Sequence, residues 1–283
     1  MESHTHNFAT PIGIGVTPWS NAEMREQIPE FLEVLSRSPF SENKGGMGPP
    51  HLFLTWFAAK KLKPSTIIES GVWRGAGTWI LEQACPDSRL VCLDPNLAIV
   101  EYQSPNAEYL DTDFDLIDWS EMDRNNTLLF FDDHQNAFER IKSAYLWGFR
   151  HLIFEDNYPA SIGDCYSLKK FLGGSGHNST PSQRSLIRKI RDRLIYKLGG
   201  NAYPKRIPSN SAHRAAILRI AEVYAELPPV VSPKHTRFGI PWERIPATPP
   251  LFSKLPASPS DIFADSAESY TYLCYLRLGK GND

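Results

Sequence analysis

The chain has 283 residues, of which 41% are hydrophobic and 22% are charged, and its formal net charge is -2. This balance supports a globular protein with a sizeable core, and it provides no overall field that would attract nucleic acid or an acidic membrane. The longest apolar run, at residues 52–59, is too short to cross a bilayer, and the first twenty residues lack the pattern of a secretory leader. We therefore expect a cytoplasmic protein.

Two helices are predicted near the start of the chain. Residues 1–20 show no periodicity and are expected to form a loosely packed arm. Apolar residues then recur at helical spacing near 29–36 and over 50–62, on either side of the stretch ENKGGMGPP, which must be a loop. Two interpretations of that loop are open, a cover over a site and a plain connector. Residues 1–64 are expected to form an arm and a helical lid before a catalytic domain at 65–283.

Four short apolar runs follow, and each of them ends in acidic residues: TIIES, RLVCLD, TLLFFDD and RHLIFED. Helix-length segments separate the runs, which indicates strand–helix–strand units in a parallel sheet with buried strands. We therefore predict an α/β fold with a doubly wound, mostly parallel sheet. Ligands of such sheets bind at the carboxyl ends of the strands, so the acids there are expected to converge on one edge: Glu69, Asp94, Asp132, Asp133, Glu155 and Asp156.

The regular pattern weakens in the last part of the chain, and residues 160–262 are expected to form an insertion or cover. Apolar spacing predicts helices over 185–198 and 212–225. The first has a basic side, which favours a solvated face over a grip on an acidic substrate. Frequent prolines at 227–260 predict a wrapping segment, and the stretch ESYTYLCYLRLGK is suited to a final strand.

The four cysteines form no CxxC pair. Two of them, Cys92 and Cys274, lie in apolar stretches typical of strands. We therefore expect reduced cysteines with a structural role, rather than disulfides or a zinc site.

The stretch IIESGVWRGAGTWILEQ, at residues 67–83, predicts a strand, a glycine turn and the start of a helix. Glycine permits positive φ and a close approach of a ligand to the backbone, and the free N–H groups of a helix start favour an anion. Asp94, at the end of the next strand, is placed to accept hydrogen bonds from ribose hydroxyls. The alternative is a tight connection with a helix-capping acid. A ligand that carries a carboxylate or phosphate is the favoured interpretation.

A second group of polar residues lies in FFDDHQ and IFEDNYP, at residues 130–135 and 153–159. If these strands are neighbours, Asp132 or Asp133 faces the acids of the other strand. Carboxylates gathered in one cleft repel each other, and a hard divalent cation such as Mg²⁺ or Ca²⁺ removes that conflict. His134 is placed to accept a proton at neutral pH. The alternative is a set of capping acids beside a surface histidine.

The stretch ESGVWRGAGTWI resembles the E-x-G-V-W-R-G-G cofactor turn of metal-dependent O-methyltransferases of the macrocin and cephalosporin hydroxylase-like group. Residues 66–159 as a whole are similar to class I S-adenosylmethionine-dependent methyltransferases. The resemblance implies a Rossmann-like methyltransferase fold and an enzyme that uses S-adenosylmethionine and Mg²⁺. It assigns cofactor contacts to Glu69, Gly71, Val72, Trp73, Gly75, Thr78 and Asp94. It assigns the metal to Asp132, Glu155 and Asp156, with His134 or Asp133 as the base.

The resemblance leaves some alternatives open. That group usually has Asp-Gly-Asp where this chain has Asp132-Asp133-His134, so either aspartate is a candidate metal ligand. The acids after the next strand also align one residue later, with the Asp-Asn pair of catechol methyltransferases. The implied function is metal-assisted O-methylation of a small-molecule hydroxyl by a homo-oligomer, with no nucleic-acid or membrane partner. A metal-independent methyltransferase, for example of nitrogen, and a non-catalytic metabolite-binding protein are the alternatives.

Overall fold

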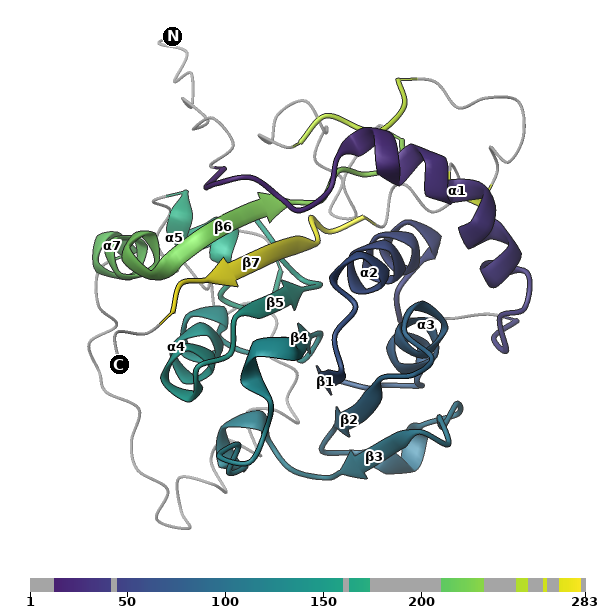
Figure 1. Ribbon diagram of the computed structural model, residues 1–283, viewed down its shortest axis with the longest axis horizontal. Coiled ribbons are helices and arrows are strands. Elements are labelled where there is room, and N and C mark those ends of the chain that lie inside the picture. The colour runs from purple at the N-terminus through teal and green to yellow at the C-terminus, as the bar shows by residue number, and fades with distance from the viewer. Residues whose placement is uncertain are drawn as a thin grey trace, which may run out of the picture.

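The computed structural model describes residues 13–41, 45–159, 163–173, 210–231, 248–253, 262–263 and 270–280. These residues contain a seven-stranded sheet with the strand order β3-β2-β1-β4-β5-β7-β6 (Figure 1). The strands are β1 Thr66–Ser70, β2 Arg89–Leu93, β3 Ala107–Leu110, β4 Thr127–Phe131, β5 His151–Phe154, β6 Ala221–Glu226 and β7 Cys274–Leu278. Strands β1 to β5 pair in parallel, whereas β7 is antiparallel to both of its neighbours. The predicted Rossmann-like methyltransferase fold is confirmed.

Helices cover both faces of the sheet (Figure 1). They are α1 Asn21–Leu35, α2 Pro49–Leu62, α3 Ala76–Ala84, α4 Ala137–Trp147, α5 Leu168–Leu172 and α7 Asn210–Ile220, with short 3-10 turns η1 Leu97–Ile99, η2 Phe114–Leu116 and η3 Arg124–Asn126. One core holds residues of α1, α2 and α3, and the other holds residues of α4, α5 and α7. Because side chains alternate along a strand, Ile67 packs in the first core and Ile68 in the second. The continuous apolar runs of the central strands follow from this double burial.

The two N-terminal helices pack tightly on each other. A capping box at Ser20 and Glu23 starts α1 well before the residues whose spacing predicted it. Phe31 of α1 contacts Trp56 of α2, with 5.8 Å between the ring centroids. All residues of α2 from Pro50 to Ala59 are buried, so this helix belongs to the core. The division of the chain at residue 64 stays a prediction.

The prediction of a helix over residues 212–225 was wrong in its second half. Helix α7 ends at Ile220, and the next six residues form β6, which pairs antiparallel with β7. The hydrogen bonds of β7, together with a bridge from Ile14 to Tyr224, override the helical propensity of this alanine- and glutamate-containing stretch. The final strand is confirmed as β7. The helix expected at 185–198 and most of the proline-rich segment lie outside the described residues.

The four cysteines are free and buried, as predicted. Strand β3 was missed by the sequence reasoning, because it is only partly buried and lacks a continuous apolar run. Within the described part of the chain, no helix combines the length and the apolar character needed to span a membrane.

Replacement of Gly71 by alanine is expected to destabilise the protein by at least about 2 kcal/mol, because a side chain is strained at this backbone conformation. Gly71 has a φ of 95°, and an added Cβ would lie 2.3 Å from the carbonyl oxygen of Asp132. Denaturant unfolding measures the change. Gly13→Ala is the control, since nothing lies within 4 Å of a Cβ there; equal stability of the two variants would contradict the prediction.

Candidate functional site

The glycine turn joins β1 to α3 through residues 71–75. Gly71, Trp73 and Gly75 have positive φ angles of 95°, 51° and 96°. A Cβ on Gly71 would lie 2.3 Å from the carbonyl oxygen of Asp132, and one on Gly75 would lie 2.4 Å from that of Tyr102. The turn is therefore pressed against the end of β4 on one side and the segment after β2 on the other, which only glycine permits.

Asp94 holds this turn in place. Its Oδ2 accepts hydrogen bonds from the backbone N–H groups of Val72 and Trp73, at 2.9 and 3.0 Å. Its Oδ1 accepts one from the N–H of Asn96 at 2.8 Å. Asp94 braces the turn without capping a helix, because α3 begins after Gly75 with no side-chain cap; the capping acid considered from the sequence is not found there. A carboxylate offers about four lone-pair sites, so a ribose hydroxyl still finds an acceptor there.

Val72 and Trp73, two further residues of the turn that the resemblance assigned to the cofactor, differ in burial. Val72 is buried, whereas Trp73 is 46% exposed. The ring of Trp73 lies beside the loop between α1 and α2, since a Cβ on Gly45 would come within 3.8 Å of it. Trp73 therefore stands at the surface of the turn, where it can wall a bound ligand.

Glu69 lies beneath the turn and is buried. Its Oε2 accepts a hydrogen bond from the hydroxyl of Thr78, the first-turn residue of α3 that the sequence also assigned to the cofactor. Its Oε1 is buried without a hydrogen-bond partner among the described residues. Burial raises the pKa of Glu69 to about 8. Gly77 makes room for this carboxyl, because a Cβ there would lie 2.1 Å from Oε1.

Three side chains at the ends of β4 and β5 form the acidic cluster. Ligand atoms of Asp132, His134 and Asp156 all lie within 4.8 Å of one another. The Nδ1 of His134 lies 3.0 Å from Oδ2 of Asp156 and 2.9 Å from Oδ1 of Asp164. The hydrogen bond to Asp164 and the nearby carboxylates raise the pKa of His134 to about 10. Burial, followed by the charges of Glu155 and Asp156, raises the pKa of Asp132 well above its ordinary value.

The donor set of the cluster fits a divalent cation. Oδ2 of Asp156 is buried and accepts no hydrogen bond from the described residues, although it forms an ion pair with Nδ1 of His134, so it keeps acceptor capacity for a cation. The two carboxylates suit Mg²⁺ or Mn²⁺. An adjoining cavity of about 20 Å³, lined in part by His134 and Asp156, is large enough for one water-sized species.

Asp133 points away from this cluster. Its Oδ2 accepts a hydrogen bond from the Ser70 hydroxyl at 2.7 Å and pairs with the guanidinium of Arg140 at 2.9 Å. Arg140 is buried and also pairs with Asp113 and Asp115 at 2.7 Å. The structure thus brings Asp132 into the cluster and leaves Asp133 in a separate ion-pair network.

Glu155, predicted as a metal ligand, has a side-chain partner of its own in the structure. Its carboxyl bonds to Nδ1 of His51, a residue of α2 that the sequence reasoning missed. Asn157, the residue of the later alignment, is buried, and its amide donates to the Tyr224 hydroxyl at 2.9 Å and accepts from the N–H of Lys169 at 2.7 Å. The only signal for His51 was a lone histidine in an apolar helix.

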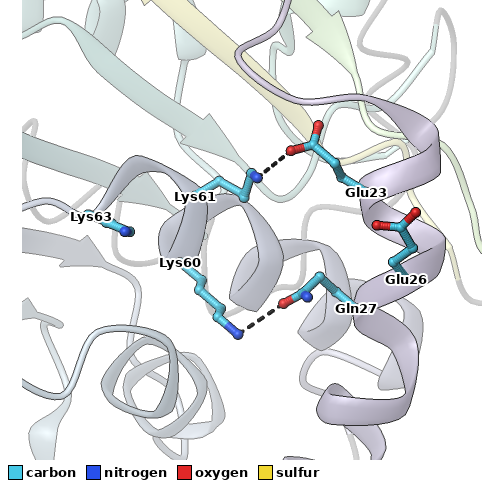
Figure 2. Close-up of a pocket in the computed structure, with 6 residues that line it drawn as sticks. All are labelled: Glu23, Glu26, Gln27, Lys60, Lys61 and Lys63. Atoms are coloured by element: carbon cyan, nitrogen blue, oxygen red, sulfur yellow. Dashed lines mark hydrogen bonds and ion pairs between the residues drawn. The ribbon is translucent and has the colours of Figure 1, made fainter.

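A larger groove lies between α1 and α2 (Figure 2). It measures about 360 Å³ and is lined by Glu23, Glu26, Gln27, Lys60, Lys61 and Lys63. Its lysines stand at the end of α2 from which the chain enters the amino end of β1. The groove therefore lies away from the carboxyl edge of the sheet. Its ion pairs, such as Lys61 with Glu23, are partly exposed and contribute little to stability.

Among known proteins, only solved structures are similar to this chain. No family model matches the sequence, and no curated protein matches it. The O-methyltransferase TomG from Streptomyces achromogenes, in complex with SAM, is 13% identical over 92% of this chain and 89% of its own, with a TM-score of 0.39. SAH-bound PaMTH1, a Podospora anserina methyltransferase, is 12% identical over 94% and 100% of the two chains, with a TM-score of 0.42. An O-methyltransferase from Bacillus cereus in complex with SAH is 12% identical over 91% of each chain, with a TM-score of 0.39.

These scores are low, so the fold rests on the strand order of the chain itself. That order, with β7 inserted antiparallel between β5 and β6, is the order of the class I methyltransferase fold. A fold of this kind supports many chemistries, so the function has to be argued from the site.

The wild-type protein is expected to lose stability as pH rises, in part because of Glu69. Replacement of Glu69 by glutamine should remove that part of the pH dependence. The carboxyl is protonated in the folded protein up to about pH 8 but ionises near 4.5 in the unfolded chain. The folded state therefore binds more protons between these values, and the free energy of unfolding falls by at most about 1.4 kcal/mol per pH unit in that window.

Thermal unfolding of both proteins from pH 5 to 8 measures this effect. The melting temperature of Glu69→Gln, relative to that of the wild type, should increase as pH rises. Glu121→Gln is the control: this side chain is exposed, so its melting temperature should stay close to that of the wild type at every pH. A constant difference between Glu69→Gln and the wild type across this range would show that the carboxyl is ionised in the folded protein.

Proposed function

We propose that the protein is a S-adenosylmethionine-dependent, divalent-metal-assisted methyltransferase that acts on a hydroxyl group of a small molecule. One observation carries the proposal: the backbone of the glycine turn at Gly71 touches the backbone of Asp132, the residue that opens the acidic cluster. A ligand held by the turn therefore lies next to anything held by the cluster. Methyl transfer needs such an arrangement, with the donor and the acceptor oxygen adjacent and in line.

The turn has the chemistry that the cofactor needs. The start of α3 favours the carboxylate of the methionine part, and Asp94 is an acceptor for the ribose hydroxyls. Below the turn, Glu69 presents a buried oxygen without a partner among the described residues, which suits the ammonium group of an amino acid. Trp73 stands half-exposed on the turn and is placed to exclude water from the bound cofactor.

The cluster supplies the ligands for the cation. Asp132 and Asp156 would hold it, with His134 as a further ligand. A bound divalent cation lowers the pKa of a coordinated hydroxyl and fixes its position. In the structure His134 forms ion pairs with Asp156 and Asp164 and keeps its proton at neutral pH, so it becomes a base only when these carboxylates turn to a cation. Asp133 is paired with Arg140 and is the weaker candidate for the base.

Binding of S-adenosylhomocysteine tests the cofactor half of the proposal. Calorimetry should give micromolar affinity for the wild type, and Asp94→Asn should weaken it about tenfold or more, because one charge-assisted hydrogen bond of this kind is worth about 1.5–3 kcal/mol. Asp118→Asn is the control, since that carboxylate is exposed and bonds only to its own turn. Absence of binding in the wild type would refute the methyltransferase function.

Binding of Mn²⁺, used as a paramagnetic substitute for Mg²⁺, tests the metal half. Asp132→Asn and Asp156→Asn are each expected to weaken binding at least tenfold, because each removes a charged ligand. Asp133→Asn should bind as the wild type does, since its carboxyl faces Arg140. Electron paramagnetic resonance of free Mn²⁺ gives the three affinities. Wild-type affinity in Asp132→Asn together with lost affinity in Asp133→Asn would reverse the assignment of the two aspartates.

A further inference from the structure

His51 links three parts of the fold at the carboxyl edge of the sheet. It lies in the first turn of α2 and is 4% exposed. Its Nδ1 bonds to Oε1 of Glu155, at the end of β5. Its Nε2 accepts a hydrogen bond from the backbone N–H of Thr271, just before β7, at 2.9 Å. The ring stands edge-on to Tyr270, with 4.9 Å between the centroids.

These contacts determine which nitrogen of His51 carries the proton. A backbone N–H can only donate, so Nε2 must be the acceptor and is unprotonated. Nδ1 of the neutral ring then carries the hydrogen and donates it to the carboxyl of Glu155. His51 therefore acts as a fixed donor for one oxygen of that carboxyl.

Glu155 is itself close to the acidic cluster. Its neighbour in sequence, Asp156, is a member, and its backbone N–H donates to the carbonyl of Phe131, one residue before Asp132, at 3.0 Å. The charge of Glu155 also contributes, after burial, to the raised pKa of Asp132. The orientation of this carboxyl therefore affects the field at the position between Asp132 and Asp156.

We propose that His51 is a positioning residue for the metal site: its Nδ1–H fixes the carboxyl of Glu155 beside the Asp132–His134–Asp156 cluster and thereby sets the affinity for the cation. This inference rests on the proposed function. Groups that orient the ligands of a metal are often as important as the ligands, and their loss typically costs about 10–100-fold in affinity. Through His51 the packing of α2 and of the segment before β7 acts on the site.

Two substitutions of His51 separate positioning from plain packing. In His51→Asn the amide nitrogen takes the place of Nδ1 and retains the donor to Glu155. In His51→Gln the amide oxygen takes the place of Nε2 and retains the acceptor for Thr271, but the donor to Glu155 is lost. Both variants leave a smaller side chain in the same buried position, so both should lower the melting temperature.

The measurement is Mn²⁺ affinity without cofactor or acceptor, by electron paramagnetic resonance, with the melting temperature recorded alongside. His51→Gln is expected to weaken Mn²⁺ binding about 10–100-fold, whereas His51→Asn stays close to the wild type. Thr271→Val is a control, because it removes only the hydroxyl contacts to His51 and Glu155 and should leave the affinity unchanged. Equal affinities in all four proteins, or equal losses in both His51 variants, would overturn the inference.

Two other outcomes have definite meanings. If the wild type does not bind Mn²⁺, the metal half of the proposed function fails and the role of His51 fails with it. If the wild type binds Mn²⁺ and His51→Gln does not change the affinity, only the role of His51 is overturned.

If neither His51 variant folds, Glu155→Asp gives the same comparison, because the shorter side chain keeps the charge but withdraws from His51. Its affinity should fall about 10–100-fold, and an unchanged affinity would overturn the inference.

Discussion

The candidate site depends on the close approach of two backbone segments, the glycine turn after β1 and the residues that follow β4. These strands are neighbours in the sheet, and their carboxyl ends stop together, with Ser70 opposite Phe131. A residue larger than glycine at position 71 would collide with the Asp132 carbonyl. This single contact places the glycine turn next to the acidic cluster, and the proposed chemistry follows from that proximity.

The acids at this edge are stabilised in different ways, and the difference is informative. Asp133 is paired with the buried Arg140, Glu155 accepts from His51, and Glu69 is stabilised by protonation. Asp132 and Asp156 lie with His134 in the cluster, and the charge of Lys170 also acts on Asp156. Since like charges at short range repel strongly in a buried environment, these two carboxylates are the ones for which an external cation gains most.

The sequence was sufficient to predict strands β1, β2, β4, β5 and β7, the glycine turn and the acidic strand ends, because each is a local pattern in which burial or turn geometry dictates the residue types. The orientation of individual carboxyl groups could not be predicted from the sequence. Asp132 and Asp133 are adjacent, and Arg140 on α4, together with the Ser70 hydroxyl, holds Asp133 away from the cluster. The partner of Glu155 is 104 residues away in the chain. Strand β6 was missed for a similar reason, since its pairing with β7 is not a local property.

The central claim is that one edge of the sheet holds a cofactor and a cation side by side. Crystals grown with S-adenosylhomocysteine and Mn²⁺, with diffraction recorded at the manganese absorption edge, test it most directly. The account predicts an anomalous peak between the carboxylates of Asp132 and Asp156, and density for the cofactor over the turn with its ribose at Asp94. A peak elsewhere, or cofactor bound away from the glycine turn, would contradict it.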